Sequence, residues 1–218
     1  MTAENGSSAG TMGLRPSEVR VLGCLLEKQR TTPDAYPLSL NALRLACNQS
    51  TNREPVVEYD DAIIRDALHR LERRGFARLA SGAGSRAPKY RHLLAEALPM
   101  DAKEQALMCV LMLRGPQTPG ELKQRSERMC AFADLADVQE TLERLIEREL
   151  AERLPRRAGQ KEERYAQLLG DESEQHSEAE PAAGASSSED LRERVGRLER
   201  EMLELRAAMR DPSSQLQT

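Results

Sequence analysis

Apolar residues recur at helical spacing in two stretches of the chain, and a pair of short extended runs follows each stretch. In the first stretch the apolar positions predict three helices, one through Val19 and Leu26, one around residues 40–46, and one from near Asp60 to Gly75. After Gly75 the segments FARLAS and PKYRHLL form extended runs around a glycine-rich turn, which indicates a β-hairpin. The first stretch therefore predicts three helices followed by two strands.

The second stretch repeats the first. EVRVLGCLLEKQRTTP at 18–33 aligns without a gap with EQALMCVLMLRGPQTP at 104–119, at an offset of 86 residues. The offset falls to 74 at the third helix, so the first copy carries 12 extra residues between its first and third helices. Two copies of one unit are the economical interpretation. The second copy predicts helices near 102–114, 119–130 and 134–149, followed by the strands LAERLP and ERYAQLL.

Three helices followed by a hairpin are typical of the winged helix-turn-helix. The expected fold class is mainly α with small β-hairpins (α+β), built as tandem winged helix-turn-helix domains with a C-terminal coiled-coil-like helix. The expected divisions are a disordered N-terminal tail (1–13), winged-helix domain 1 (14–98), winged-helix domain 2 (99–170), a flexible acidic linker (171–188), a heptad helix (189–210) and a tail (211–218).

Two long motifs carry a family resemblance. LGCLLEKQRTTPDAYPLSLNALRLACNQSTNREPV at 22–56, together with LRGPQTPGEL at 113–122, resembles the YceH family of uncharacterised bacterial proteins. The similarity runs from about residue 16 to about residue 169. The resemblance implies a tandem winged-helix fold and says little about activity. It does not extend to residues 171–218.

Charge is unevenly distributed along the chain, whose formal net charge is −4. Residues 14–98 hold 14 Lys and Arg against 10 Asp and Glu, residues 99–170 hold 12 against 13, and residues 171–218 hold 6 against 12. Because only the first folded segment is basic, an anionic partner is expected there.

The second helix of a helix-turn-helix motif enters the major groove of DNA, so its exposed side chains are the candidate contacts. In the first copy these side chains and the basic residues of the hairpin predict a nucleic-acid surface, with the acidic start of the helix excluded from phosphate contact. The candidates are Arg65, His69, Arg70, Arg73, Arg74, Arg86, Lys89 and Arg91.

The same face of the second copy carries Glu140, Glu143 and Glu147, which makes groove insertion unfavourable there. We expect the second copy to serve mainly as a docking or dimer element, with phosphate contact by its basic hairpin left open. An alternative applies to both copies: the arginines form solvated faces that pair with acids at i, i+4, as Asp66 would with Arg70, or they dock a protein.

The segment ACNQSTNREP follows the second helix, inside the interval that holds the extra residues. Two interpretations stay open. In the structural one, its amides and hydroxyls bond the long turn while Arg53 and Glu54 pair with the neighbouring copy or subunit. In the functional one, Asn52 and Arg53 project and hold a phosphate or a partner carboxylate. The motif residues are Asn48, Asn52, Arg53, Glu54 and Pro55.

Near the C-terminus six apolar residues follow heptad spacing, which predicts a parallel homodimer seam. A helix that folds back on its own domain is the alternative. The seam residues are Leu191, Val195, Leu198, Met202, Leu205 and Met209.

No recognisable catalytic, phosphate-loop or metal-ligating signature occurs, and the three histidines and four cysteines are scattered. We therefore expect no enzyme, no cofactor and no metal. The absence of a signal peptide and of a long apolar segment predicts a cytoplasmic protein with no membrane contact.

Two functions from different classes are expected. One is DNA binding of the transcription-regulator type, with double-stranded DNA as partner and domain 1 as the contact surface. The other is a non-enzymatic adaptor for an unidentified protein, similar to the winged-helix subunits of bacterial chromosome-condensing complexes. A basic surface with salt-sensitive binding favours the first, and an exposed apolar groove between the copies favours the second.

Overall fold

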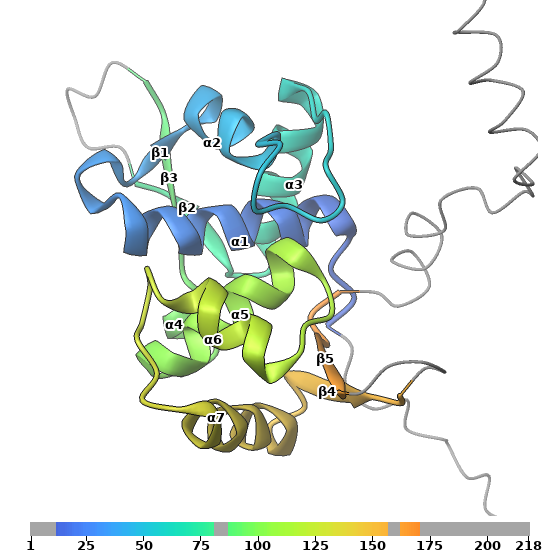
Figure 1. Ribbon diagram of the computed structural model, residues 1–218. Helices are drawn as coiled ribbons and strands as arrows, with labels where there is room; N and C mark the ends of the chain where they lie inside the picture. The colour runs from blue at the N-terminus through green and yellow to red at the C-terminus, as the bar shows by residue number, and fades with distance from the viewer. Residues whose placement is uncertain (1–11, 81–86, 157–161, 171–218) are drawn as a thin grey trace, which may run out of the picture. The chain divides into compact units, whose positions relative to one another are not determined.

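The structure is a computed structural model that describes residues 12–80, 87–156 and 162–170 of the 218-residue chain (Figure 1). The described residues form helices and two small antiparallel sheets, so the expected α+β composition is confirmed. Arg86, the acidic linker at 171–188 and the heptad helix at 189–210 lie outside the described residues, as do nearly all of the N-terminal tail and the final residues. The predicted dimer seam therefore stays a prediction.

Each half of the described chain begins with a long helix and has a hairpin after its third α-helix. The first half contains α1 (Pro16–Thr31), the 3-10 turn η1 (Pro33–Ala35), β1 (Leu38–Ser39), α2 (Leu40–Cys47), α3 (Asp61–Arg73), β2 (Ala77–Leu79), β3 (Lys89–His92) and α4 (Leu94–Ala97). The second half contains α5 (Ala102–Arg114), α6 (Pro119–Ser126), α7 (Leu135–Glu147), β4 (Ala151–Leu154) and β5 (Arg164–Gln167). The helix expected at 119–130 ends earlier, at Ser126, whose carbonyl accepts the N–H groups of Met129 and Cys130 in a closing turn.

The sheets repeat as the helices do. In the first half β3 lies between β1 and β2, and Leu38 pairs with Tyr90. In the second half β4 pairs with β5, and Gln117 forms an isolated bridge to Tyr165. Tyr90 and Tyr165 are equivalent residues of the two copies, so both halves attach the segment before their second helix to the last strand of the hairpin.

The third helix of the first half ends in a Schellman motif. Gly75 has a φ of 75°, and the N–H of Phe76 donates to the carbonyl of Leu71 at 2.8 Å. Glycine suits this position because it lacks the Cβ that makes left-handed backbone costly.

The equivalent motif at the end of α7 uses a glutamate. Glu149 has a φ of 54°, and the N–H of Leu150 donates to the carbonyl of Leu145 at 2.9 Å. The side chain of Glu149 is exposed, so its backbone conformation is held by the hydrogen-bonded turn.

The two halves share one hydrophobic core, in which α1 packs along α5 (Figure 1). A Cβ at Gly23 would lie 2.9 Å from a methyl carbon of Leu113, which is closer than real Cβ contacts come. One turn before Leu113 on α5, the thiol of Cys109 lies 3.5 Å from the carbonyl oxygen of Gly23. The absence of a side chain at Gly23 thus lets the first helices of the two halves approach closely. The predicted division between residues 98 and 99 falls in the segment that joins α4 to α5. The residues on the two sides of it contribute to the same core.

We predict that Glu149→Gly raises the free energy of unfolding by about 1 kcal/mol, because it relieves left-handed strain at an exposed site without removing a contact. Chemical denaturation of the full chain measures the effect. Gly75→Ala, at the matching position of α3, should lower the free energy of unfolding by a similar amount. A loss of stability in Glu149→Gly would contradict the strain argument.

Candidate functional site

The predicted nucleic-acid surface lies on α3, whose inward side packs into the core through Ile64, Ala67, Leu68 and Leu71. Along the first three turns of the outward side the basic side chains already have acidic neighbours, as the solvated alternative expects. The pairs are Arg65 with Asp61 at 3.4 Å, His69 with Glu72 at 3.7 Å, and Arg70 with Asp66 at 2.8 Å. The hydrogen bond from Arg70 lowers the pKa of Asp66.

The C-terminal end of α3 differs from its start. Arg73 is exposed and forms no ion pair or hydrogen bond within the described part of the chain. Arg74 donates to the carbonyls of Met12 and Gly13, at 2.7 and 3.1 Å, and so anchors the segment that precedes α1. The structure therefore leaves Arg73 available for a partner and commits Arg74 to the fold.

On the hairpin next to α3, Arg78 of β2 lies directly opposite Arg91 of β3. Arg91 pairs with Glu96 at 3.0 Å, but its Nε is buried with no hydrogen-bond partner in the described structure. Like charges that face each other across two strands repel, so this pair favours a nearby anion. Arg78 was missed by the sequence analysis, although its place in FARLAS, at the same hairpin as Lys89 and Arg91, was visible.

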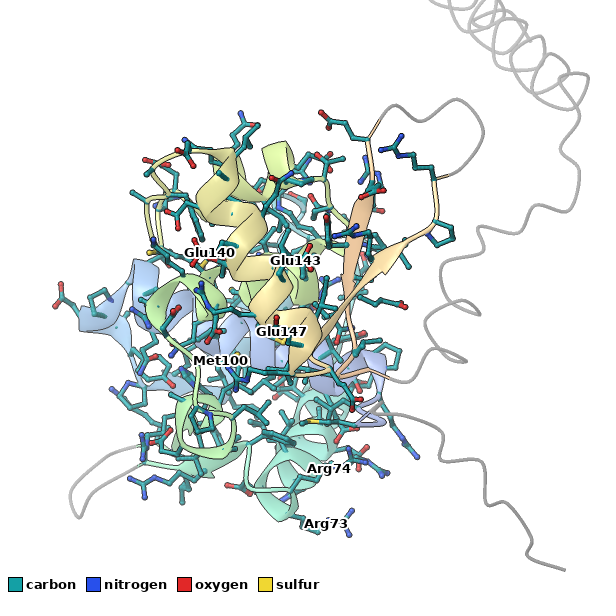
Figure 2. The ribbon with its side chains drawn as sticks, turned by 90° about the horizontal axis from the view of Figure 1, so that it is seen from below. Arg73, Arg74, Met100, Glu140, Glu143 and Glu147 are labelled. Carbon is teal, nitrogen blue, oxygen red and sulfur yellow. The ribbon has the colours of Figure 1, made fainter. Side chains whose placement is uncertain are left out.

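The second half presents an acidic surface at the equivalent place. Figure 2 shows Glu140, Glu143 and Glu147 along α7, and Arg73 and Arg74 at the end of α3. Arg144 of α7 and Arg148, its C-cap residue, hold the helix to the rest of the second half. Arg144 pairs with Glu140 at 3.4 Å and with Asp101 at 3.2 Å, and Arg148 pairs with Glu104 at 3.1 Å.

The cations of the second hairpin that the structure describes are paired with acids. Arg153 pairs with Glu143, Arg156 with Glu163 at 3.6 Å, and Arg164 with Glu121 at 3.0 Å. The two halves thus differ in the charge that their third helices expose, in the direction expected from the sequence.

The central residue of the ACNQSTNREP motif points inward. The side chain of Arg53 is fully buried, and it donates to both carboxylate oxygens of Glu27 on α1, at 3.1 and 2.6 Å. It also donates to the carbonyl of Ala46 at 3.0 Å and to the side-chain oxygen of Gln49 at 2.9 Å. The interpretation in which Arg53 projects to hold a phosphate is therefore wrong. Its partner is also in its own half, whereas we expected the neighbouring copy.

A second buried arginine supports the same loop from α1. Arg20 donates to the carbonyl of Cys47 at 3.2 Å and to that of Pro55 at 2.6 Å. Neither Arg20 nor Glu27 was among the residues predicted from the sequence. Their spacing of seven residues was a usable signal, since it places them on one side of α1, two turns apart.

The rest of the motif loop is closed by amide contacts. The side chain of Asn48 donates to the carbonyl of Tyr59 at 2.8 Å and accepts its N–H at 2.9 Å. Asn52 is in the left-handed region, with a φ of 61°, and its side-chain oxygen accepts from Arg114 of the second half. The N–H of Glu54 donates to the carbonyl of Leu113 at 2.9 Å. The loop therefore joins the two halves through Asn52 and the backbone of Glu54, before the cis peptide bond to Pro55.

The Glu27 and Arg53 side chains shift each other's pKa. Burial alone raises the pKa of Glu27, but the hydrogen bonds and charge of Arg53 outweigh it and lower that pKa below its ordinary value. Burial opposes the charge of Arg53 as well, yet the contact with Glu27 raises its pKa. Both groups are therefore charged at neutral pH, as a paired buried site requires.

His92 belongs to the interior of the first half. Its Nε2 lies 2.6 Å from the side-chain oxygen of Gln29, and its Nδ1 accepts the N–H of Leu94 at 3.2 Å. The acceptor role of Nδ1 leaves the proton on Nε2, so the ring is neutral. Burial lowers the pKa of His92 to about 4, although Glu96 acts in the opposite direction.

Within residues 12–80, 87–156 and 162–170, no cluster of three or more His, Cys, Asp or Glu side chains is arranged to hold a metal ion. None of the helices in these ranges is both long and apolar enough to cross a membrane.

Residues 14–160 match the model of a family described as a protein of unknown function, DUF480. Among curated proteins the chain is similar to a UPF0502 protein of Solibacter usitatus, 49% identical over 195 residues that cover 89% of this chain and 94% of the relative. A UPF0502 protein of Geobacter metallireducens is 50% identical over 194 residues, with 87% and 88% covered. One of Shewanella is 43% identical over 211 residues, with 89% and 95% covered. The expected membership of an uncharacterised family is confirmed, and the resemblance to the YceH family in particular stays a prediction.

We predict that Arg53→Ala lowers the free energy of unfolding by about 3 kcal/mol, because it leaves the Glu27 carboxylate without its buried partner. Denaturant titration measures the loss. Arg70→Ala, which breaks the exposed pair with Asp66, should lower the free energy of unfolding far less, because solvent screens this pair. Adding Glu27→Gln to Arg53→Ala should recover part of the loss. Equal losses in the two arginine variants would contradict the buried-pair argument.

We predict that stability falls as the pH drops from about 6.5 to about 4, because His92 is neutral in the fold and gains a proton more readily in the unfolded chain. Because the pKa of His92 is lower in the folded than in the unfolded chain, its contribution to the free energy of unfolding is fully present above the unfolded pKa. Denaturation midpoints between pH 7 and pH 4.5 test it. His92→Asn, which keeps an acceptor for Leu94, should flatten this dependence, whereas His69→Asn on the surface should leave it unchanged.

Proposed function

The chain belongs to the DUF480 family of proteins of unknown function, and on that premise we propose from its own geometry that it binds double-stranded DNA through its first half, as a transcription-regulator-type protein with tandem winged helices. Support comes from the order of elements. In each half three α-helices precede a hairpin, and in the first half α2 and α3 stand where a helix-turn-helix has its supporting and recognition helices.

The observation that carries the proposal is the cationic corner between α3 and the β2–β3 hairpin. Arg73 is exposed without a partner in the described structure, and a few residues later Arg78 faces Arg91 across the hairpin. A DNA phosphate near this corner would relieve the repulsion between Arg78 and Arg91 and give Arg73 a partner. The start of α3 is acidic, with Asp60 as its N-cap and Asp61 in its first turn, so contact is directed to its C-terminal end.

The contrast between the halves also supports this assignment. The exposed glutamates of α7 would repel phosphate along the equivalent helix (Figure 2). Arg144 of that helix pairs with Asp101 and Glu104, and the C-cap residue Arg148 pairs with Glu104. A protein of this design would approach DNA with one half and leave the other for contacts with something else.

A second candidate function is that of a protein adaptor, favoured by three exposed apolar side chains around the turn between α2 and α3. These are Leu45 at 59%, Val56 at 57% and Ile63 at 39% exposure. The feature expected for an adaptor was an apolar groove between the halves. The cavity that lies there is lined mainly by polar and charged residues, so we rank the adaptor second.

The test is fluorescence anisotropy of a mixed genomic-fragment DNA probe with the full chain at several salt concentrations. We predict binding that weakens with salt, and a three- to tenfold weaker affinity for Arg73→Ala with the log–log salt slope reduced by about 1, as for one lost phosphate contact. Lys123→Ala on α6 makes the same change in charge away from the corner and should bind as the unaltered chain does. Absence of binding at low salt, or equal losses in both variants, would refute the proposal.

A further inference from the structure

A cavity of about 610 Å³ lies where the ACNQSTNREP loop meets α1, α5 and α6. Its walls are residues 48–52 of the loop, the last turns of α1, the end of α5 and the segment that closes α6. The volume is in the range of small-molecule sites. Both halves of the fold contribute, and the loop wall lies within the interval that holds the 12 residues that the second copy lacks.

The charged groups of this cavity are predominantly cationic. Lys28, Arg114, Arg125 and Arg128 line it, together with one carboxylate, that of Glu27. The charge of Glu27 is already matched by Arg53 at 2.6 Å and by Lys28 at 3.3 Å. The arginines from the second half therefore represent excess positive charge around the cavity.

The partners of these three arginines leave that excess largely in place. Arg114 contacts the neutral side-chain oxygen of Asn52. Arg125 shares its guanidinium between Gln117 and Glu121, the latter at 3.5 Å. Arg128 is exposed and makes no ion pair or hydrogen bond to any described residue.

The pKa of Arg114 is lowered by its surroundings. Burial lowers its pKa first, and the charges of Arg125 and Arg53 lower it further, more than Glu27 and Glu121 raise it. An anion placed among these guanidinium groups would reverse this unfavourable balance. Planar guanidinium groups also match the oxygen geometry of phosphate, to which they donate paired hydrogen bonds.

The neutral part of the lining points to the rest of the ligand. Hydroxyl and amide side chains dominate it, from Thr31, Thr32 and residues 48–52, with Val110, Leu113 and Met129 as the apolar part. No aromatic side chain is among the lining residues, so the cavity offers a nucleobase no aromatic ring on which to stack. The neutral lining therefore suits a ligand whose uncharged part carries hydroxyl groups.

We propose that this cavity binds a small phosphorylated polyol of the sugar-phosphate class, with Arg114, Arg125 and Arg128 holding the phosphate and the loop amides and hydroxyls holding the sugar. Such a ligand would touch both halves at once and would stabilise the fold by binding. The site does not depend on DNA binding, because its residues lie outside α3 and the β2–β3 hairpin.

The experiment follows thermal unfolding and calorimetric binding of the full chain with fructose 1,6-bisphosphate and glucose 6-phosphate at constant ionic strength. Glucose, inorganic phosphate, citrate and adenosine monophosphate serve as comparison probes. The expected result is a rise in Tm with at least one sugar phosphate that exceeds the rise with every comparison probe. No rise with either sugar phosphate, or an equal or larger rise with any comparison probe, would overturn the proposed ligand class.

Two variants locate the site. Arg128→Gln should weaken sugar-phosphate binding about tenfold, as loss of a charged hydrogen bond would. Its Tm without ligand should not change, because Arg128 has no partner to lose in the described fold. Arg73→Gln removes the same charge at the proposed DNA surface and should bind the sugar phosphate normally. Equal weakening in both variants would show general attraction of anions and overturn the assigned site.

Discussion

The ion pair between Arg53 and Glu27 is the contact on which the first half of the fold depends. It lies in the interior, where an unpaired charge is costly, and it links the extra loop to the C-terminal half of α1. Through the same guanidinium the loop also reaches the end of α2 at Ala46. The pair thus fixes the position of the loop relative to two helices. The contacts that the loop makes with Leu113 and Arg114 of α5 depend on that position.

A second constraint is the close approach of α1 and α5 at Gly23. Equivalent helices of the two copies pack against each other there, so the duplication is also the way in which the chain completes its core. Each half alone would expose this helix face. The loop and the Gly23 contact act together, because Glu54 donates to the carbonyl of Leu113, the residue that lies over Gly23. The cavity between loop and helices results from these two fixed points.

The order of elements was predictable from the sequence because each depends on local signals. Apolar periodicity located α3 and α7, and Gly75 marked the end of α3 correctly. The left-handed residue at Glu149 was not predictable, since a glutamate carries no signal for that conformation and the hydrogen-bonded turn imposes it. Candidate surface cations were found from charge alone, but their availability depends on neighbours. Arg74 bonds to backbone carbonyls 61 and 62 residues away, a relation that no local pattern contains.

Polar residues in loops were the hardest to interpret. Arg53 sits in a segment so hydrophilic that exposure was a natural expectation, yet its charge is satisfied by Glu27, 26 residues earlier in the chain. The pairing becomes visible only when α1 and the loop are placed in space. The same is true of Arg114 and Arg128, which the sequence gives no reason to group with residues 48–52 and which the fold brings to one cavity.

The bridge between Leu14 and Gly170 has a mechanical consequence. It joins the first described segment to the last, runs parallel, and includes the hydrogen bond from the N–H of Leu14 to the carbonyl of Leu169 at 2.9 Å. Tension applied along the chain would pull these two segments in opposite directions along their own length. The hydrogen bonds of the bridge would then be loaded together, in shear. They would have to break at the same time before the first described segment could separate from the last.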